Sequence, residues 1–465
     1  MHRLIPIGLA VLFVAAGGDR PPLVEAARNG DRDALRALLQ KGASVNGAEA
    51  DGTTALHWAS YRDDLASADL LIRAGANVNA ASDLGATPLW TASLNGSESM
   101  VRRLLDAGAN PNAALLAGEA PVMVAARTGN AAIVEQLIAK GANVNARGAR
   151  GQTALMWAVA QRHSHVVKVL LAHHADLQVR SAVWSQVMAV PPHGYLPYNK
   201  DIPAGGETAL LFAARVGDLE SARLLVASGA NVNDADAWGV SATTLAAHSG
   251  FEELVELLLE KGADPNAAPA GFTALHEAIM RRDEKMVGAL LAHSADANTP
   301  LRTWTPTRRS SEDFNFAPEL VGATPFWLAA RWSEPGIMRQ LVRRGANPLV
   351  VHRGERMVDG RGEAFIRRTE ETTPIMAAMG MGGGRAWVPL AREGREGRTL
   401  EAVKLAVELG VDVNRANTDG RTALDAAKAL KYETVAAFLV EHGAKSGSGG
   451  PGTVDRSKDG PILRR

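Results

Sequence analysis

Short apolar stripes recur along the chain at helical spacing. Aliphatic residues stand three and four positions apart, as in Val101, Leu104 and Leu105. This spacing places the aliphatic side chains on one face of an amphipathic helix. Before each stripe the sequence carries another short helical segment, which usually begins at Thr, and Gly is common between the two. The pattern predicts pairs of short helices joined by tight turns.

The helix pairs repeat with a nearly fixed period. Thr54, Thr87, Ala120 and Thr153 each begin a first helix, and they lie 33 residues apart. The other starts carry the same pattern and stand at Pro21, Thr208, Ser241, Thr273, Thr324, Thr373 and Thr422. Such self-similarity predicts a repeat architecture, because one helix pair can bury its apolar face only by stacking on its neighbours.

Capping and turn residues stand at fixed places in each copy. Thr at the start accepts hydrogen bonds from the first free N–H groups of the helix, and Pro is tolerated directly after it. Asp51-Gly52 and Asp419-Gly420 are turn pairs that lead into the next copy. A Gly follows the second helix, where a left-handed conformation is favoured, at Gly42, Gly75, Gly108, Gly141, Gly229, Gly262, Gly345, Gly410 and Gly443.

These motifs resemble those of the ankyrin-repeat family. Thr-Ala-Leu-His begins at Thr54 and Thr273, Gly-Ala-Asn-Val-Asn closes copies at 75–79, 141–145 and 229–233, and about eleven copies cover residues 21–444. The resemblance implies an all-α solenoid of stacked helix pairs with β-hairpin fingers. It also implies that a macromolecular partner binds the concave face made by fingers and first helices. His57 and His276 occupy the family's opening motif, so we interpret them as structural.

Four spacings exceed the period and predict long loop insertions. They lie near residues 178–205, 299–321, 350–371 and 380–399. The first three follow a second helix, where a finger is expected, whereas the fourth lies between the two helices of its copy. Two of the copies that precede an insertion lack the closing Gly and carry His174 and Ser294 in its place. We therefore expect an altered helix exit at both sites.

The insertions hold a disproportionate share of the aromatic residues. Amphipathic aromatic side chains on finger loops are typical of a partner-binding surface. The alternative is that these rings fold back and pack on the solenoid. The candidates are Trp184, Tyr195 and Tyr198 in the first insertion, and Trp304, Phe314 and Phe316 in the second.

Arginine recurs at an equivalent position near the end of several first helices. Stacked repeats would place these guanidinium groups about 10 Å apart in a broken line. Such a line suits a partner with an acidic or carboxylate-rich surface. The alternative is that the side chains pair with neighbouring Asp or Glu residues. The set consists of Arg28, Arg127, Arg215, Arg281 and Arg331.

Composition narrows the possible function classes. Of 465 residues, 46% are hydrophobic and 5% aromatic, and 50 basic residues balance 50 acidic ones. A nucleic-acid-binding protein normally has a basic excess, so nucleic acid is not expected as a partner. The chain has no Cys, which excludes disulfides, thiolate nucleophiles and cysteine-based zinc sites.

Other candidate chemistry does not form a complete motif. His163 and His165 belong to the densest histidine group, but their spacing does not fit metal ligands on one helix face. The glycine-rich segment 380–385 lacks the strand and the Gly-Lys-Ser/Thr ending of a phosphate-binding loop. There is neither a Gly-x-Ser-x-Gly elbow nor a His-Glu-x-x-His helix. We predict no metal, no cofactor and no catalytic residue.

The two ends of the chain differ from the repeats. Residues 1–17 have the order of a secretory signal peptide, with a short basic start, an apolar stretch and small residues. That stretch is shorter than the roughly 20 residues that a membrane-spanning helix needs; the alternative is a capping helix. Because Cys is absent and Arg outnumbers Lys, we expect a bacterial protein of the periplasm, or a secreted one. The polar tail at 445–465 is expected to be disordered.

We therefore predict an exported, monomeric and non-catalytic scaffold that binds an unidentified protein. One alternative is a ligand-binding or enzymatic site built by the long insertions, with His193, Tyr195, Tyr198 or Asp201 as its polar groups. Another is a secreted effector that acts on a host protein.

Overall fold

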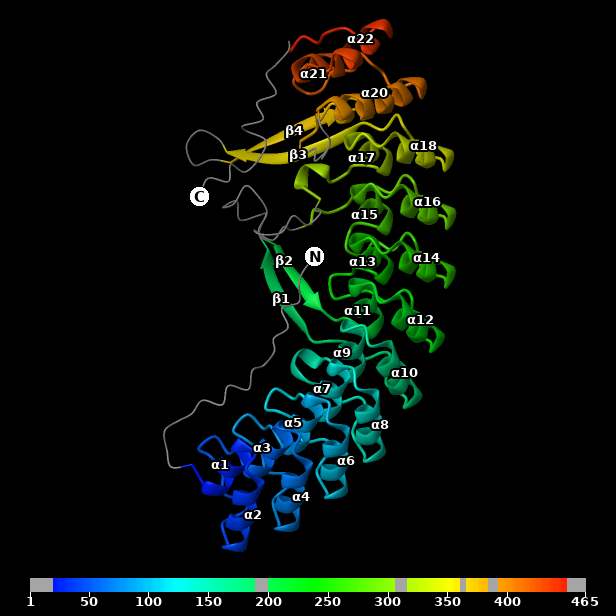
Figure 1. Ribbon diagram of the computed structural model, residues 1–465. Coiled ribbons are helices and arrows are strands. Elements are labelled where there is room, and N and C mark those ends of the chain that lie inside the picture. Colours follow the sequence, from blue (N-terminus) through cyan, green and yellow to red (C-terminus); the bar gives the residue numbers. More distant parts are fainter. Residues whose placement is uncertain (1–19, 189–199, 306–315, 360–364, 384–391, 450–465) are drawn as a thin grey trace. The chain divides into compact units, whose positions relative to one another are not determined.

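A computed structural model of the chain describes residues 20–188, 200–305, 316–359, 365–383 and 392–449. The chain divides into two compact units, Met1–Asp176 and Leu177–Arg465, which are called unit 1 and unit 2 below. Both are built from stacked helix pairs (Figure 1). The expected signal peptide at 1–17 and residues 450–465 of the expected tail lie outside the described residues.

In unit 1 each helix pair is one copy of the repeat. First helices contact first helices of the adjacent copies, and second helices contact second helices. The first helices are α1 (Pro22–Asn29), α3 (Ala55–Tyr61), α5 (Pro88–Asn95), α7 (Pro121–Thr128) and α9 (Ala154–Ala160). The second helices are α2 (Arg32–Gln40), α4 (Leu65–Arg73), α6 (Glu98–Asp106), α8 (Ala131–Ala139) and α10 (Ser164–Ala172), and a 3-10 turn, η1 (Ala149–Gly151), precedes α9.

Unit 2 repeats this arrangement with six further pairs in its described part. Its first helices are α11 (Ala209–Val216), α13 (Ala242–Ser249), α15 (Ala274–Arg281), α17 (Pro325–Arg331), α19 (Pro374–Ala378) and α21 (Ala423–Leu430). Its second helices are α12 (Leu219–Ala227), α14 (Glu252–Glu260), α16 (Glu284–Ala292), α18 (Pro335–Arg343), α20 (Arg392–Glu408) and α22 (Glu433–Glu441). The predicted solenoid of stacked helix pairs is thus confirmed.

The first helices begin where the Thr residues predict. The Thr87 hydroxyl accepts a hydrogen bond from the N–H of Trp90, which caps α5. In α3 the His57 Nδ1 accepts from the Thr54 N–H at 3.1 Å, and its Nε2 donates to the Ala86 carbonyl of the next finger at 2.9 Å. The ring therefore joins two copies, which fits the structural role predicted for it.

The prediction of an altered helix exit at His174 and Ser294 is wrong. Both residues adopt left-handed backbone conformations, with φ of 60° and 69°, close to the 88° of Gly141 at the same position of a regular copy. The Ala that follows donates its N–H to a carbonyl of the second helix in all three copies. A non-glycine residue pays a small conformational cost here, and the chain leaves the helix in the usual way.

A ladder of asparagine side chains links the fingers of successive copies. The Asn112 Oδ1 accepts from the Asn143 N–H at 2.7 Å, and its Nδ2 donates to the Gly141 carbonyl at 2.9 Å. The same two bonds join Asn298 to Asn347 and Gly345 across the second insertion. Further rungs are provided by Asn46, Asn79, Asn233, Asn266 and Asn414.

Two of the predicted loop insertions contain β structure. Strands β1 (Val183–Met188) and β2 (Lys200–Gly205) pair antiparallel, with Val183 opposite Gly205 and Met188 opposite Lys200. Strands β3 (His352–Asp359) and β4 (Phe365–Thr372) form a second antiparallel ribbon. Each ribbon follows a copy in which the ladder Asn is replaced, by Gln178 and by Leu349 respectively.

The other insertions and the tail also differ in detail from the prediction. The second insertion ends in a 3-10 turn, η3 (Pro318–Leu320). Residues 392–399, assigned to the fourth insertion, belong to α20. Residues 445–449 are hydrogen-bonded to the finger that precedes the last copy: the Lys445 N–H donates to Asn414, and the Gly449 N–H donates to Gly420. No helix in the described part of the chain is long and apolar enough to cross a membrane.

Candidate partner-binding surface

The insertions of unit 2 lie on the side of the first helices. Figure 1 shows both ribbons beside the first-helix row, with the second helices on the opposite side of that row. The base of the first ribbon is fixed by Arg180, whose guanidinium donates to the carbonyls of Gly206 and Ala235 at 2.8 Å and contacts the Asp234 carboxylate at 2.9 Å. The ribbon is therefore attached to the next finger along the chain.

Trp184 lies on the first ribbon with part of its side chain in solvent. It is 41% exposed, and its neighbours Val183 and Val187 are 61% and 70% exposed. The ring packs over Gly205, where a Cβ would lie only 2.7 Å from its Cζ3 atom. The other candidates in this insertion, His193, Tyr195 and Tyr198, lie outside the described residues. Asp201 is described, and its carboxylate accepts a hydrogen bond from the Ser185 hydroxyl.

The aromatic residues of the second insertion are less exposed. Phe316 is fully buried, with its ring 5.8 Å from Phe272 and 6.2 Å from His276 between centroids. Trp238, on the neighbouring finger, lies 5.6 Å from Phe272 and extends this aromatic row. Phe316 thus packs on the repeats, which is the alternative that the sequence left open. Trp304 is half-buried, and Phe314 lies outside the described residues.

Segments of three insertions meet at α17. His352, from β3, stacks on Trp327 with a centroid distance of 4.3 Å, and its Nε2 donates to the Glu319 carbonyl beside η3. Arg331 is only 3% exposed and donates to the Gly383 carbonyl, at the start of the fourth insertion, at 2.6 Å. Burial lowers the pKa of His352, so the ring is neutral near pH 7. This cluster joins the insertions to the repeat stack.

The arginine set is engaged with its own chain. Arg28 lies over the ring of Trp58 in the next copy, 5.2 Å from its centroid. Arg127 lies over Trp157 at 5.6 Å and pairs with Glu119 at 2.8 Å. These contacts are cation–π and ionic interactions within the solenoid.

Arg215 resembles Arg127 in its ion pair, whereas Arg281 stands at a different position of its copy. Arg215 pairs with Glu207, just as Arg127 pairs with the acid that precedes its helix. Arg281 does not belong to the set, because it stands eight residues after its helix start whereas the others stand seven after theirs. Its guanidinium donates to the His248 carbonyl of the preceding copy at 2.9 Å. We correct the alignment of Arg281 accordingly.

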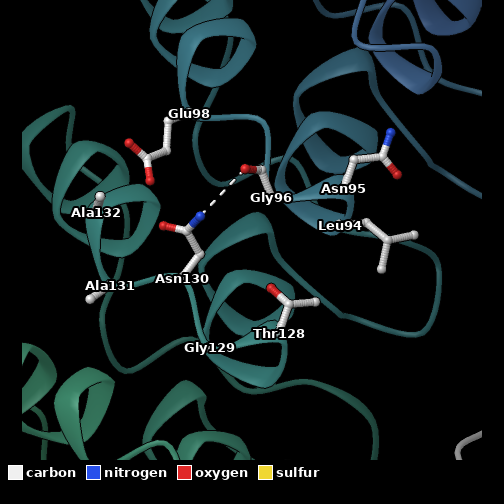
Figure 2. Close-up of a pocket in the computed structure, with 9 residues that line it drawn as sticks. All are labelled: Leu94, Asn95, Gly96, Glu98, Thr128, Gly129, Asn130, Ala131 and Ala132. Atoms are coloured by element: carbon white, nitrogen blue, oxygen red, sulfur yellow. Dashed lines mark hydrogen bonds between the residues drawn. The ribbon is translucent and has the colours of Figure 1, made fainter.

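Two hollows lie on the surface of the described residues. One, of about 420 Å³, lies between the inter-helix turns of the third and fourth copies and is drawn in Figure 2, where Asn130 donates to the Gly96 carbonyl at 3.4 Å. Glu98 is the one acidic side chain that lines it. The other, of about 580 Å³, lies among the fingers of unit 2 and includes Asp264 and Arg302. Neither lining contains His, Cys, Lys or Tyr, the usual proton-transfer groups besides carboxylates.

The histidine group makes backbone contacts. The Nε2 atoms of His163 and His165 lie 3.1 Å and 2.8 Å from the carbonyls of Arg127 and Gly129. Over the described ranges, no three His, Asp or Glu side chains gather closely enough to hold a metal ion.

Comparison with known proteins decides the family. The family described as "Ankyrin repeats (3 copies)" matches residues 23–114, 89–181, 193–269 and 210–303, more than half of the chain. The chain belongs to the ankyrin-repeat family. A crystal structure of the human ASB11 ankyrin repeat domain is 30% identical and matches over 53% of this chain and 100% of that domain, with a TM-score of 0.43. A search of curated proteins found no match.

Two features of this ankyrin array were missed by the sequence analysis. The second Asn of the Gly-Ala-Asn-Val-Asn motif forms the ladder between fingers, and its regular recurrence could have indicated a link between copies. The ion pairs Glu119–Arg127 and Glu207–Arg215 share a spacing of eight residues. That spacing is visible in the sequence, but only the fold shows that it spans one first helix.

Proposed function

We propose that this ankyrin-repeat chain is a non-catalytic scaffold that captures a protein partner on the finger side of unit 2. The observation that carries the proposal is the first ribbon, which exposes Val183, Trp184 and Val187 beside the finger row. Partly exposed aromatic and aliphatic side chains on a rigid base are typical of protein interfaces. The ankyrin fold supports this reading, since members of the family are protein-interaction scaffolds.

An acidic partner remains part of the proposal. The Arg215 side chain is 51% exposed although it pairs with Glu207. A carboxylate on the partner could share this guanidinium, which has five N–H donors. Arg127 is less exposed, with 23% of its side chain in solvent.

Replacing residues 183–204 with a short Gly/Ser linker tests the scaffold. The linker removes the exposed apolar side chains but leaves the helix pairs on either side unchanged. We expect crosslinking and mass spectrometry to show loss of the captured protein, with a melting temperature close to that of the native chain.

A matched control changes an exposed apolar residue elsewhere. Val440 is 55% exposed on the second-helix side, and Val440→Ser is expected to retain capture. Capture that survives the linker would place the binding surface elsewhere. An equal loss of melting temperature would show that the ribbon is needed for folding rather than for binding.

We also propose that the chain is exported, either to the periplasm or out of a bacterial cell. The support is the order of residues 1–17, with a basic start, an apolar stretch and small residues. Deletion of residues 4–16 is expected to retain the protein in the cytoplasm. Amino-terminal sequencing of the native protein should find a new terminus near Gly17 or Gly18. An intact Met1 in the cytoplasmic fraction would contradict export.

A further inference from the structure

Among the residues that the structure describes, strand β1 is paired on one side only. Its residues 183–187 are all exposed, and its backbone pairs with β2 alone among the described elements. Residues 181–188 contain no charged side chain. An uncharged, apolar edge strand is a ready template for another extended chain, and proteins usually blunt such edges with charge, proline or a covering segment.

The pairing with β2 indicates which backbone groups of β1 face outward. Pro203 lies opposite Ser185 and has no N–H to donate, so this pair belongs to the non-hydrogen-bonded positions of the ribbon. The carbonyl of Gly205, opposite Val183, accepts instead from the Ala237 N–H of the next finger. The N–H and C=O groups of Val183, Ser185 and Val187 therefore point away from β2.

The outer edge of β2 offers fewer pairing groups because of the same two residues. Pro203 offers no donor there, and the Gly205 carbonyl is already bonded to the finger. The second ribbon is contacted on both sides near its base. The Glu371 N–H of β4 donates to the Thr418 hydroxyl at 3.0 Å, and β3 contacts η3. The exposed side chains of the second ribbon include Arg353, Glu355 and Arg367.

We propose that the outer edge of β1 binds an extended segment of the protein partner by β-strand addition. The backbone of that segment would pair with Val183, Ser185 and Val187. Its side chains facing Val183 and Val187 would be apolar and preferably β-branched, because such cross-strand pairs stabilise a sheet. The inference names the partner's binding element and rests on the scaffold function proposed above.

The test compares two substitutions at one position of the full chain. Ser185→Pro removes an outward N–H, whereas Ser185→Ala removes only the hydroxyl that contacts Asp201. The probe is a synthetic hexapeptide of alternating valine and threonine, blocked at both ends. We expect the native chain and Ser185→Ala to bind it, with slower hydrogen exchange at Val183, Ser185 and Val187. Ser185→Pro should bind at least ten-fold more weakly.

Two checks keep the outcome clear. The exchange rates of the inward amides of Trp184 and Gln186 report whether the ribbon survives Ser185→Pro. Val187→Lys retains every backbone donor but adds a charge beside the edge, and it should also weaken binding. The same peptide with a central proline should not bind.

Three results would overturn the inference. The first is equal binding by Ser185→Pro and Ser185→Ala while the ribbon remains intact. The second is no binding of the peptide by the native chain. The third is protection of β1 that rises with protein concentration without peptide, since a second copy would then occupy the edge. Partner capture that persists in Ser185→Pro would reject strand addition and leave the scaffold function standing.

Discussion

Leu258→Ala is expected to lower the free energy of unfolding by about 2–5 kcal/mol, the usual range for a large-to-small change in a core. The Leu258 side chain has no exposed surface, and its helix α14 packs against α12, α13 and α16. The cavity lies between copies, so the helices around it lose contacts on both sides.

The loss should be local, because each repeat contacts only its neighbours. Hydrogen exchange should become faster in α12 to α16 and change little in α3 and α4 of unit 1. Glu256→Ala is the matched control, since Glu256 is exposed on the same helix. Uniform loss of protection along the chain would contradict a one-dimensional array.

Acidification should destabilise the repeats through their buried histidines, and His276 should contribute most. Burial lowers the pKa of His276 to about 4 from 6.5. Its Nδ1 accepts from the Thr273 N–H at 3.1 Å, and its Nε2 lies 3.1 Å from the Thr299 carbonyl. A proton on Nδ1 would abolish the first of these bonds. The native state therefore holds the neutral ring.

The direction of the pH effect on the free energy of unfolding depends on whether the folded or the unfolded chain binds the proton. Between pH 6.5 and about 4 the unfolded chain takes up a proton at His276 and the folded chain does not. The free energy of unfolding therefore falls as the pH drops through this window, by about 3 kcal/mol in total. His276→Asn should flatten this dependence in urea unfolding, whereas His442→Asn, at an exposed position, should not. Identical pH profiles for His276→Asn and the native chain would contradict the assignment.

Local chemistry made the repeat predictable. Thr87 caps its helix through contacts within a few residues, and Gly141 adopts the left-handed conformation that its position requires. Such features depend on neighbours in sequence, so a sequence pattern can indicate them. The helix exit at His174 was not predicted correctly. Hydrogen bonds of the helix and of the finger hold the left-handed conformation there without glycine.

The insertions were less predictable because their structure depends on distant partners. The pairing of Val183 with Gly205 joins residues 22 positions apart, and the segment Val-Trp-Ser-Gln-Val-Met has no clean alternation of apolar and polar residues. Trp184 and Phe316 look alike as loop aromatics. Phe316 is buried because Phe272 and His276, from another copy, lie beneath it.

The asparagine rung at Asn298 has a consequence for how this protein can change. Its bonds to Asn347 and Gly345 hold two copies in register although 49 residues separate Asn298 from Asn347. The inserted loop between them therefore leaves the spacing between stacked copies unchanged. Doubling a flexible loop adds only about 0.6 kcal/mol of closure entropy. This position is therefore one where evolution or an engineer can exchange one inserted loop for another without changing the stacked copies on either side.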